Sequence, residues 1–262
     1  MVIVNQFWYS LDGTLELPEF AIEMMEHNKK KVDIVLWTYQ KLKNVPSGIK
    51  VKDASEIVSK DIFNKRVLKP MKYKDKGYVI MMFSDYFRGA LLQKHIGSWW
   101  IDTDVLLLKS LPNRENIVSS QPRIMKGLHR RQKDTFKSKR IFEADLNMSV
   151  MKFSDKDLID KWNEKMNEWY DKDNKKKWDG KKIPFNFYLK DIILEDKKES
   201  YVAEPILFNP IPYWTTKMGE VSFGYRIPSA EEIKRQSITL SFSGDRLKKN
   251  WRSIVDKINI NL

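Results

Sequence analysis

Residues 84–105 read SDYFRGALLQKHIGSWWIDTDV, and the expected fold of this chain is worked out from this stretch. Its first part carries apolar residues at helical spacing, which predicts a helix over 78–94, and Gly97 follows as a helix stop. Apolar residues then lead into and out of the triplet Asp102-Thr103-Asp104. The stretch therefore predicts a helix, a glycine turn and a buried strand that carries two carboxylates.

Two carboxylates inside an apolar segment need a reason, because burying each of them without compensation costs several kcal/mol. Alternate residues of a strand share a face, so Asp102 and Asp104 are expected to point the same way. Hard oxygen ligands suit Mg²⁺ or Mn²⁺, which bind through one or two carboxylates together with substrate phosphates. We expect a divalent-cation site here. The alternative is a strand end that emerges into solvent with two acids of no special role.

The segments on either side predict an α/β fold. Residues 2–7 and 32–37 are expected to be strands with a helix over 18–27 between them, and strand–helix–strand is typical of a parallel sheet. Further strands are expected at 49–51, 146–153, 206–207 and 238–240, and further helices over 53–64, 155–170, 184–195 and 245–258. The chain shows no internal repeat and no linker. One α/β domain with helical additions after its first half is the expected architecture.

Composition limits the classes of protein that remain. Of the 262 residues 42% are hydrophobic, which is enough to bury a core, and the absence of cysteine excludes disulfides and thiolate chemistry. The three histidines lie far apart, without the spacing of metal ligands. No apolar run approaches the ~18 residues of a membrane span, and residues 1–8 lack the features of a signal peptide, so a cytoplasmic protein is expected.

The net charge of +13 points to an anionic partner or to nothing more than a soluble surface. An excess of Lys and Arg attracts nucleic acid, anionic membrane or phosphorylated substrates. Upstream of the carboxylates, Asp85 and Arg88 lie three residues apart and share a helix face. Taken alone, this spacing indicates a surface ion pair that contributes under ~1 kcal/mol.

The order of these features carries more information than any one of them. Ser84-Asp85, Arg88, an apolar helix, Gly97, two tryptophans and Asp102-Thr103-Asp104 follow one another. This order resembles the sugar-nucleotide-binding region of DXD glycosyltransferases, in the group that includes capsular-polysaccharide synthesis enzymes, yeast-type initiating mannosyltransferases and large clostridial glucosylating toxins. A strand that ends in Trp8 and the motifs at 36–39, 44–48 and 53–57 are also similar to this group, and the resemblance covers about residues 1–110.

The resemblance implies a GT-A-like fold, which is a mixed, mostly parallel sheet flanked by helices, with helical C-terminal additions. It implies a single glycosyltransferase domain over 1–262. Residues 1–110 would form the nucleotide-sugar-binding half. Residues 111–262 would supply the acceptor side and a C-terminal lid, with Phe242-Ser243 and Trp251 as the counterparts of the family's C-terminal His and Trp.

The resemblance also implies roles for single residues. Trp8 would stack on the base, and Ser84, Asp85 and Arg88 would contact the ribose and the donor sugar. Asp102 and Asp104 would be the catalytic residues and the metal ligands. Asp102 would also lie near the ribose and the donor sugar. Asn147 would line the sugar pocket. A core position for Trp8 and a structural role for Asn147 are the alternatives.

The implied activity is metal-dependent transfer of a sugar from a nucleotide-sugar to a hydroxyl of a glycan or glycoprotein, with retention of configuration. A UDP-sugar is the expected donor, ahead of a GDP-sugar. Mn²⁺ or Mg²⁺ is the expected cofactor, peripheral contact with an anionic membrane is a further expectation, and no nucleic acid is expected as a partner.

Two alternatives stay open at the level of sequence. A basic nucleic-acid-binding protein would use the segments 65–76 and 130–140, with Trp and Tyr for stacking. A phosphatase of the haloacid-dehalogenase type is suggested by residues 10–15, SLDGTL, after an apolar strand. Ser10 stands where that family has its nucleophilic Asp, so the covalent step lacks its carboxylate and the rest of the motif is interpreted as a turn.

Overall fold

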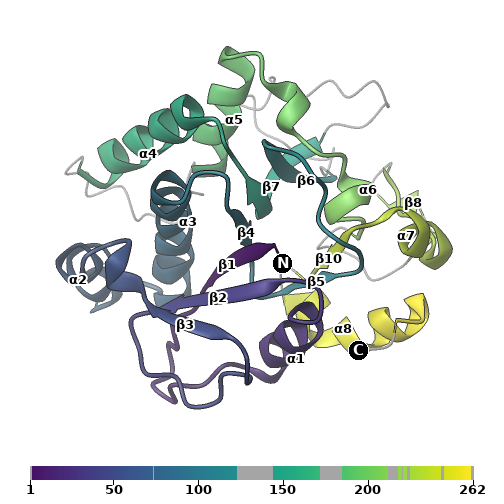
Figure 1. Cartoon of the computed structure of the whole chain (residues 1–262), viewed down its shortest axis with the longest axis horizontal. Helices are drawn as coiled ribbons and strands as arrows, with labels where there is room; N and C mark the ends of the chain where they lie inside the picture. The colour runs from purple at the N-terminus through teal and green to yellow at the C-terminus, as the bar shows by residue number, and fades with distance from the viewer. Residues whose placement is uncertain are drawn as a thin grey trace.

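A six-stranded sheet forms the centre of the computed structural model, with the strand order β3-β2-β1-β4-β7-β6 (Figure 1). The structure describes residues 2–72, 74–122, 144–171, 185–211, 218–219, 221–222, 225–242 and 245–260. The strands of the sheet are β1 (Ile3–Phe7), β2 (Asp33–Thr38), β3 (Lys50–Asp53), β4 (Trp99–Ile101), β6 (Ile117–Pro122) and β7 (Ala144–Lys152).

The sheet is mixed and mostly parallel. Strand β1 pairs in parallel with β2 and β4, and β2 pairs in parallel with β3. Strand β7 runs antiparallel to both β4 and β6. Two small antiparallel pairs lie outside it, β5 (Val105–Leu107) with β10 (Thr239–Ser241), and β8 (Val221–Ser222) with β9 (Tyr225–Arg226). The expected α/β class is confirmed.

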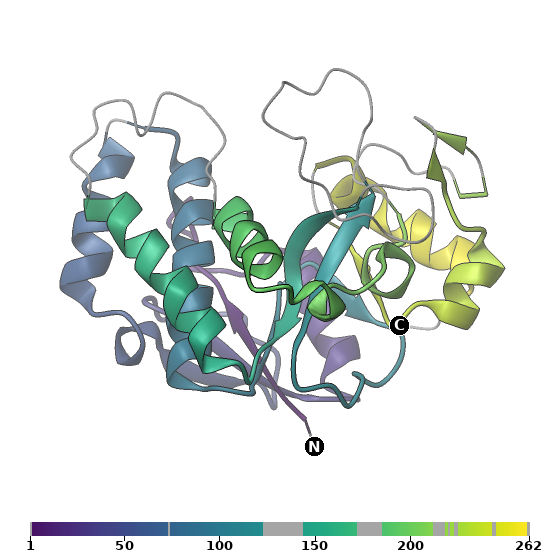
Figure 2. The ribbon, with the colours of Figure 1, turned by 90° about the horizontal axis from the view of Figure 1, so that it is seen from above.

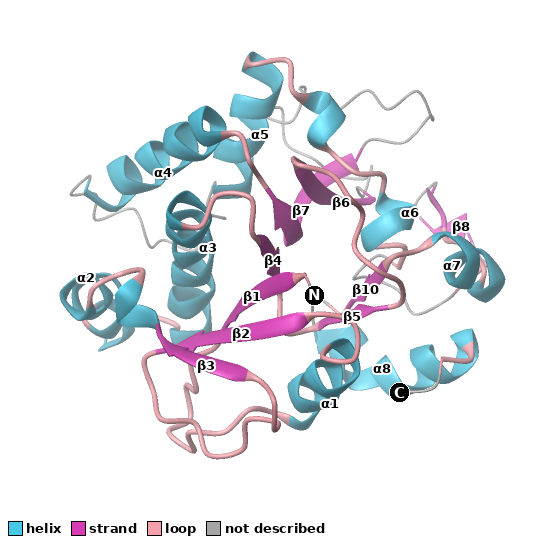
Figure 3. Ribbon diagram, viewed as in Figure 1, coloured by secondary structure: helices cyan, strands magenta, loops and turns pink. Residues whose placement is uncertain are grey.

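Helices surround the sheet (Figure 3). They are α1 (Glu19–Asn28), α2 (Lys60–Phe63), α3 (Lys76–Lys94), α4 (Lys156–Asp171), α5 (Phe185–Glu195), α6 (Pro205–Phe208), α7 (Ala230–Gln236) and α8 (Asp245–Ile258). The described residues contain no helix with both the length and the apolar character that crossing a bilayer requires.

Strands β2 and β4 are apolar on both sides, and the alternation of their side chains sorts these between two cores. Val35 and Trp37 of β2 face the core that contains α3, α4 and α5, whereas Ile34 and Leu36 face the core that contains α1, β5 and α6. In β4 only Trp100 faces the first of these cores. Burial on both faces explains why these strands read as continuous apolar runs in the sequence.

The order in which successive strands join the sheet reverses at β1. From β1 the chain passes through α1 to β2 and then to β3 on one side, and it returns through α3 to β4 on the other side. The carboxyl ends of β1 and β4 therefore lie next to each other at a topological switch point. In open α/β sheets this is where ligands bind, because the connections leave a crevice there.

Two segments differ from the expected elements. The helix expected over 53–64 is divided, because Ser59 accepts a hydrogen bond from the Ile62 N–H and starts α2 afresh, after a short 3₁₀ turn at Ala54–Glu56. The strand expected at 206–207 is wrong, since these residues belong to α6. Pro205 stands at the first helical position, where its missing N–H costs nothing.

The basic segment 65–76 is only partly a solvated surface. Its residue Arg66 is buried, with its guanidinium over the rings of Tyr86 and Tyr170 at 4.4 and 4.3 Å, and Nη1 donates to Asn167. The other basic segment singled out from the sequence, 130–140, lies outside the described residues.

Helices α3 and α4 pack side by side (Figure 2), and a glycine sets how closely they approach. The buried Asn163 of α4 donates from Nδ2 to the carbonyl of Gly89 over 2.9 Å. A Cβ at position 89 would lie 2.8 Å from Asn163 Oδ1 and would overlap with the end of Met166. A side chain at residue 89 would therefore force Asn163 and Met166 to shift, or the two helices to move apart.

Replacing Gly89 by alanine is therefore expected to lower the free energy of unfolding by about 1–3 kcal/mol, since Met166 must shift and Asn163 is held by its hydrogen bonds to the Gly89 and Ile159 carbonyls. Chemical denaturation followed by circular dichroism measures the loss. The control is Gly77→Ala in the first turn of α3, where a Cβ would approach only the Asp75 side chain, at 3.3 Å. Equal stability of the Gly89 variant and the unmodified protein would contradict the prediction.

Candidate functional site

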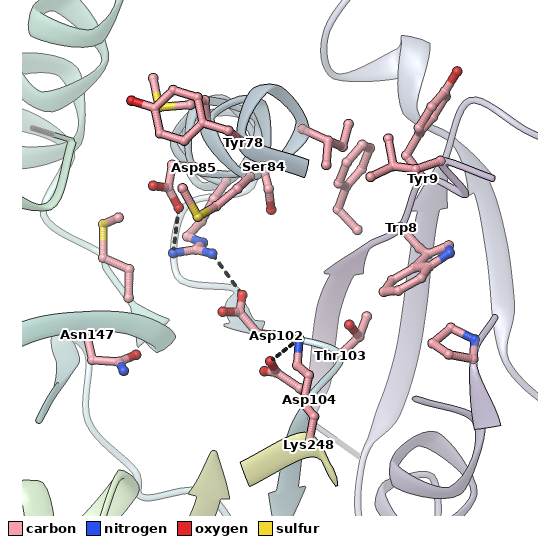
Figure 4. A pocket seen from close by; sticks show the side chains of 18 of the residues that line it. Trp8, Tyr9, Tyr78, Ser84, Asp85, Asp102, Thr103, Asp104, Asn147 and Lys248 are labelled. Atoms are coloured by element: carbon pink, nitrogen blue, oxygen red, sulfur yellow. Dashed lines mark hydrogen bonds and ion pairs between the residues drawn. The ribbon is translucent and has the colours of Figure 1, made fainter. Parts of the chain in front are cut away.

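A cavity of about 1110 Å³ opens at the carboxyl ends of β1 and β4. The donor-binding and metal-ligating residues that the sequence singled out all line this one cavity. These residues are Trp8, Ser84, Asp85, Arg88, Asp102, Asp104 and Asn147. They come from four separate parts of the fold, and the topological switch point brings them together (Figure 4). Phe242 and Trp251, by contrast, lie in a hydrophobic core, and Ser243 lies outside the described residues.

Each wall of the cavity has its own element. Trp8 directly follows β1 and continues the pairing with β2. Its backbone N–H donates to the Trp37 carbonyl over 3.1 Å. Helix α3 supplies Ser84, Asp85 and Arg88, the two aspartates lie between β4 and β5, and β7 supplies Asn147.

Arg88 is the best-buried charge in this cavity wall, with only 4% of its side chain exposed. Its Nη1 lies 3.3 Å from Asp85 Oδ1, and its Nη2 donates to Asp102 Oδ1 over 2.8 Å. The guanidinium also lies over the Trp100 ring, 4.8 Å from the ring centroid. One cation thus joins a carboxylate of α3 to a carboxylate at the end of β4.

This arrangement corrects the sequence-based interpretation of Asp85 and Arg88 as a surface pair. The two residues do pair along the helix, but the arginine is buried and shared with Asp102. The sequence could not reveal this, because the third member lies on another element. A buried charge that loses its partner costs much more than a surface charge does.

Asp102 is held firmly. Besides the bond from Arg88, its Oδ1 accepts a hydrogen bond from the indole Nε1 of Trp100 over 2.6 Å. Its backbone N–H donates to the carbonyl of Ser149 in β7 over 2.8 Å. Burial raises the pKa of Asp102 to about 7 although Arg88 opposes the rise, and burial raises the pKa of Asp85 to about 6 in the same way.

The two carboxylates do not lie on a strand, so the expectation that strand alternation aligns them is wrong. Strand β4 ends at Ile101 and β5 begins at Val105, and the triplet between them forms a turn closed by the Val105 N–H to the Asp102 carbonyl. Both side chains nevertheless line the same cavity. Asp102 points towards α3, and Asp104 points towards α8 (Figure 4).

Asp104 has a different environment from Asp102. Its side chain is 13% exposed, and its Oδ1 is buried without a hydrogen-bond partner among the described residues. Its Oδ2 lies 3.1 Å from Nζ of Lys248 in α8. Sequence analysis missed Lys248. The apolar stripe of the helix over 245–258 predicts which side packs inward, but not which other element its flank will face.

Strand β5 owes its position to α1. Asn28 donates from Nδ2 to the Val105 carbonyl over 2.7 Å, and its Oδ1 accepts the Leu107 N–H over 2.8 Å. An amide side chain thereby makes the two hydrogen bonds that a neighbouring strand would make. On the other side β10 pairs with β5, and the Phe242 N–H donates to the carbonyl of Asp104 over 2.9 Å.

The donor set fits a divalent cation that takes most of its ligands from elsewhere. The described residues contain no cluster of three or more His, Cys, Asp or Glu that could enclose a metal. The buried Oδ1 of Asp104, which has no partner among the described residues, is a hard oxygen on a side chain that lines the cavity, with Asp102 two residues away. Mg²⁺ and Mn²⁺ bind in this manner, through one or two carboxylates and the phosphates of a substrate.

Polar groups continue along the wall formed by β6 and β7. Asn147 donates from Nδ2 to Oε1 of Gln121 over 3.0 Å, while its Oδ1 accepts the Ser149 N–H over 2.9 Å. Both ends of the amide are therefore fixed. Gln121 was not predicted as a site residue, and it lines the same cavity.

The phosphatase-like segment is built as a turn. Oδ1 of Asp12 accepts hydrogen bonds from Ser10 Oγ over 2.7 Å, from the Thr14 N–H over 3.0 Å and from Thr14 Oγ1 over 2.8 Å. These bonds lower the pKa of Asp12 to about 2. The carboxylate is thus occupied within its own loop, and Gly13 takes a positive φ of 76°.

No protein-family profile and no curated protein matches this chain. Among solved structures, it is similar to the PaToxG glycosyltransferase, with 11% identity over 75% of this chain and 69% of that one and a TM-score of 0.44. It is also similar to a glycosyltransferase involved in the glycosylation of the major capsid of PBCV-1, with 10% identity, coverage of 96% and 98%, and a TM-score of 0.40. A third is the WbbM bifunctional glycosyltransferase, with 14% identity, coverage of 98% and 49%, and a TM-score of 0.42.

Removing the charge of Arg88 is expected to destabilise the protein by about 3–5 kcal/mol, because Asp85 and Asp102 then lose their cation inside the wall. Urea unfolding of Arg88→Met measures this loss. The matched control is Arg252→Met, since Arg252 also bridges two carboxylates, those of Glu19 and Glu23, but is 57% exposed. The control should lose no more than about 1 kcal/mol. Equal losses would contradict the prediction.

Asp102 should also make stability depend on pH. A carboxyl whose pKa is raised on folding leaves stability intact below its unfolded pKa, near 4, and lowers it as the pH rises towards the folded value of about 7. In metal-free buffer, the stability of the unmodified protein relative to Asp102→Asn should therefore fall between about pH 4 and pH 7 and then level off. Thermal unfolding across this range measures the difference. Asp33→Asn, at the exposed start of β2, is the control. A difference in stability between the unmodified protein and Asp102→Asn that does not change with pH would refute the raised pKa of Asp102.

Proposed function

We propose that this chain is a metal-dependent glycosyltransferase that moves a sugar from a nucleotide-sugar to a hydroxyl of a glycan or glycoprotein. The single observation that carries the proposal is the pair Asp102 and Asp104 at the switch point of the sheet. One of them is fixed by a buried arginine and the other retains an unpartnered oxygen.

The chemistry of glycosyl transfer suits this cavity. As the bond between the sugar and the nucleoside diphosphate breaks, negative charge grows on the leaving diphosphate. Asp104, with Asp102 beside it, would hold Mn²⁺ or Mg²⁺, which when bound acts as a Lewis acid on the departing phosphate oxygens. Lys248 and Arg88 add positive charge to the lining of the same cavity.

The remaining lining groups suit the other parts of a nucleotide-sugar. Trp8 offers an aromatic surface at the end of β1, on which a base would stack. Ser84 and Asp85 line the same cavity and would bond to ribose or sugar hydroxyls. Asn147, fixed by Gln121 and the Ser149 N–H, would present an oriented amide to the sugar.

Several parts of the proposal rest on the sequence resemblance of residues 1–110. These are a UDP-sugar as the donor, retention of configuration, a single GT-A-like domain and an acceptor side built from residues 111–262. Gln121, Asn147 and Lys248 of the second part of the chain line the cavity. Its volume of about 1110 Å³ exceeds the range of about 300–1,000 Å³ of ordinary small-molecule sites, which leaves room for a second substrate.

A screen of nucleotide-sugars by thermal unfolding, with and without Mn²⁺, tests the donor and the metal together. The correct donor should stabilise the protein by about 2.7 kcal/mol at about 100 times its Kd when Mn²⁺ is present, and by much less at the same concentration without Mn²⁺. Asp104→Asn should remove that stabilisation and lower metal-dependent turnover of the donor by at least about 100-fold. Asp33→Asn again serves as the control.

The outcomes separate the alternatives. Unchanged turnover in Asp104→Asn would refute the metal-ligand role of this residue. A protein that no nucleotide-sugar stabilises, but that binds DNA or RNA in a salt-dependent manner, would favour the nucleic-acid-binding alternative instead.

A further inference from the structure

Lys248 places its ammonium against the same carboxylate that would hold the proposed divalent cation. Its Nζ lies 3.1 Å from Asp104 Oδ2 and 5.2 Å from the centroid of the Phe20 ring. It also lines the cavity, beside the carboxylates (Figure 4). The ammonium neutralises the one carboxylate of the triplet that Arg88 does not contact.

The backbone of Lys248 is fixed while its ammonium is not. The neighbouring Leu247 and the Trp251 one turn later are buried in the core formed by α7, α8 and β10, with 1% and 7% of their surface exposed. The Lys248 side chain is 36% exposed. A lysine on an anchored helix can swing its charge over several ångströms, because its four-carbon stem is flexible.

An ammonium and a divalent cation compete at Asp104. Both are attracted by the same carboxylate, and they repel each other at contact distance inside a partly buried site. Displacing Lys248 would leave a positive charge on the cavity wall. A nucleoside diphosphate that arrives with the cation carries the complementary negative charge.

We propose that Lys248 is an exchangeable partner of the cation site. In the empty cavity its ammonium neutralises Asp104, and when the cation and the donor bind, it transfers to the diphosphate. Lys248 is thus a binding residue with two alternate anions. This inference rests on the proposed function, because it takes the diphosphate and the cation from it.

The two anions give opposite effects for one substitution, which makes the idea testable. Lys248→Met keeps the length of the side chain and removes its charge. It should bind Mn²⁺ alone about tenfold more tightly, because the competitor has gone, and should bind UDP in the presence of EDTA about tenfold more weakly. Isothermal titration of the whole chain measures both affinities. Lys249→Met, at the exposed next position of α8, should change neither.

Lys248→Arg guards against a merely structural effect, since a guanidinium restores the charge and should restore UDP binding. Unaltered Mn²⁺ affinity in Lys248→Met, with the unmodified protein binding Mn²⁺, would overturn the inference and leave the proposed function standing. A loss of both affinities in Lys248→Met would also overturn it, since competition predicts a gain for Mn²⁺. An unmodified protein that binds neither Mn²⁺ nor UDP, separately or together, would overturn the proposed function as well.

Discussion

The buried guanidinium of Arg88 is the interaction on which the cavity depends. It joins α3 to the end of β4 through two carboxylates, and it lies on Trp100, whose indole donates to the same Asp102. An arginine cannot give up its proton in a protein, so the charge on this wall is permanent. Two acids can therefore remain at the edge of an apolar core, and the turn that contains Asp104 begins from a fixed point.

The two aspartates illustrate how neighbouring residues acquire different properties from their partners. Asp102 has its Oδ1 occupied by a guanidinium and an indole, whereas Asp104 has one oxygen with no partner among the described residues and one on a lysine that can move. Carboxylates whose environments differ in this way commonly divide roles between them. Here Asp102 is suited to hold geometry and Asp104 to exchange partners.

The helices and strands were predictable where the local sequence has a clear apolar periodicity. The strands β1, β2 and β7 and the helices α3, α4, α5 and α8 follow from their apolar periodicity. The stretch 84–105 contains Ser84, Asp85, Arg88, Asp102 and Asp104, which line the cavity. The features that could not be predicted are those set by contacts between residues far apart in the sequence. The triplet reads as strand because its flanks are apolar, yet the chain turns there, since Val105 joins a separate sheet with β10. Lys248 was missed for the same reason. It lies far from Asp104 in the sequence, and no local pattern around it indicates that the two side chains meet.

The substitute strand made by Asn28 has a consequence for how the molecule is assembled on the ribosome. The two hydrogen bonds of that amide lie entirely within the first 107 residues, so this edge of β5 has its partners early in synthesis. The other edge of β5 and the turn with Asp104 depend on Ser149, β10 and the lysine of α8, which are made later. The last contact of the turn to be synthesised is therefore the one with α8.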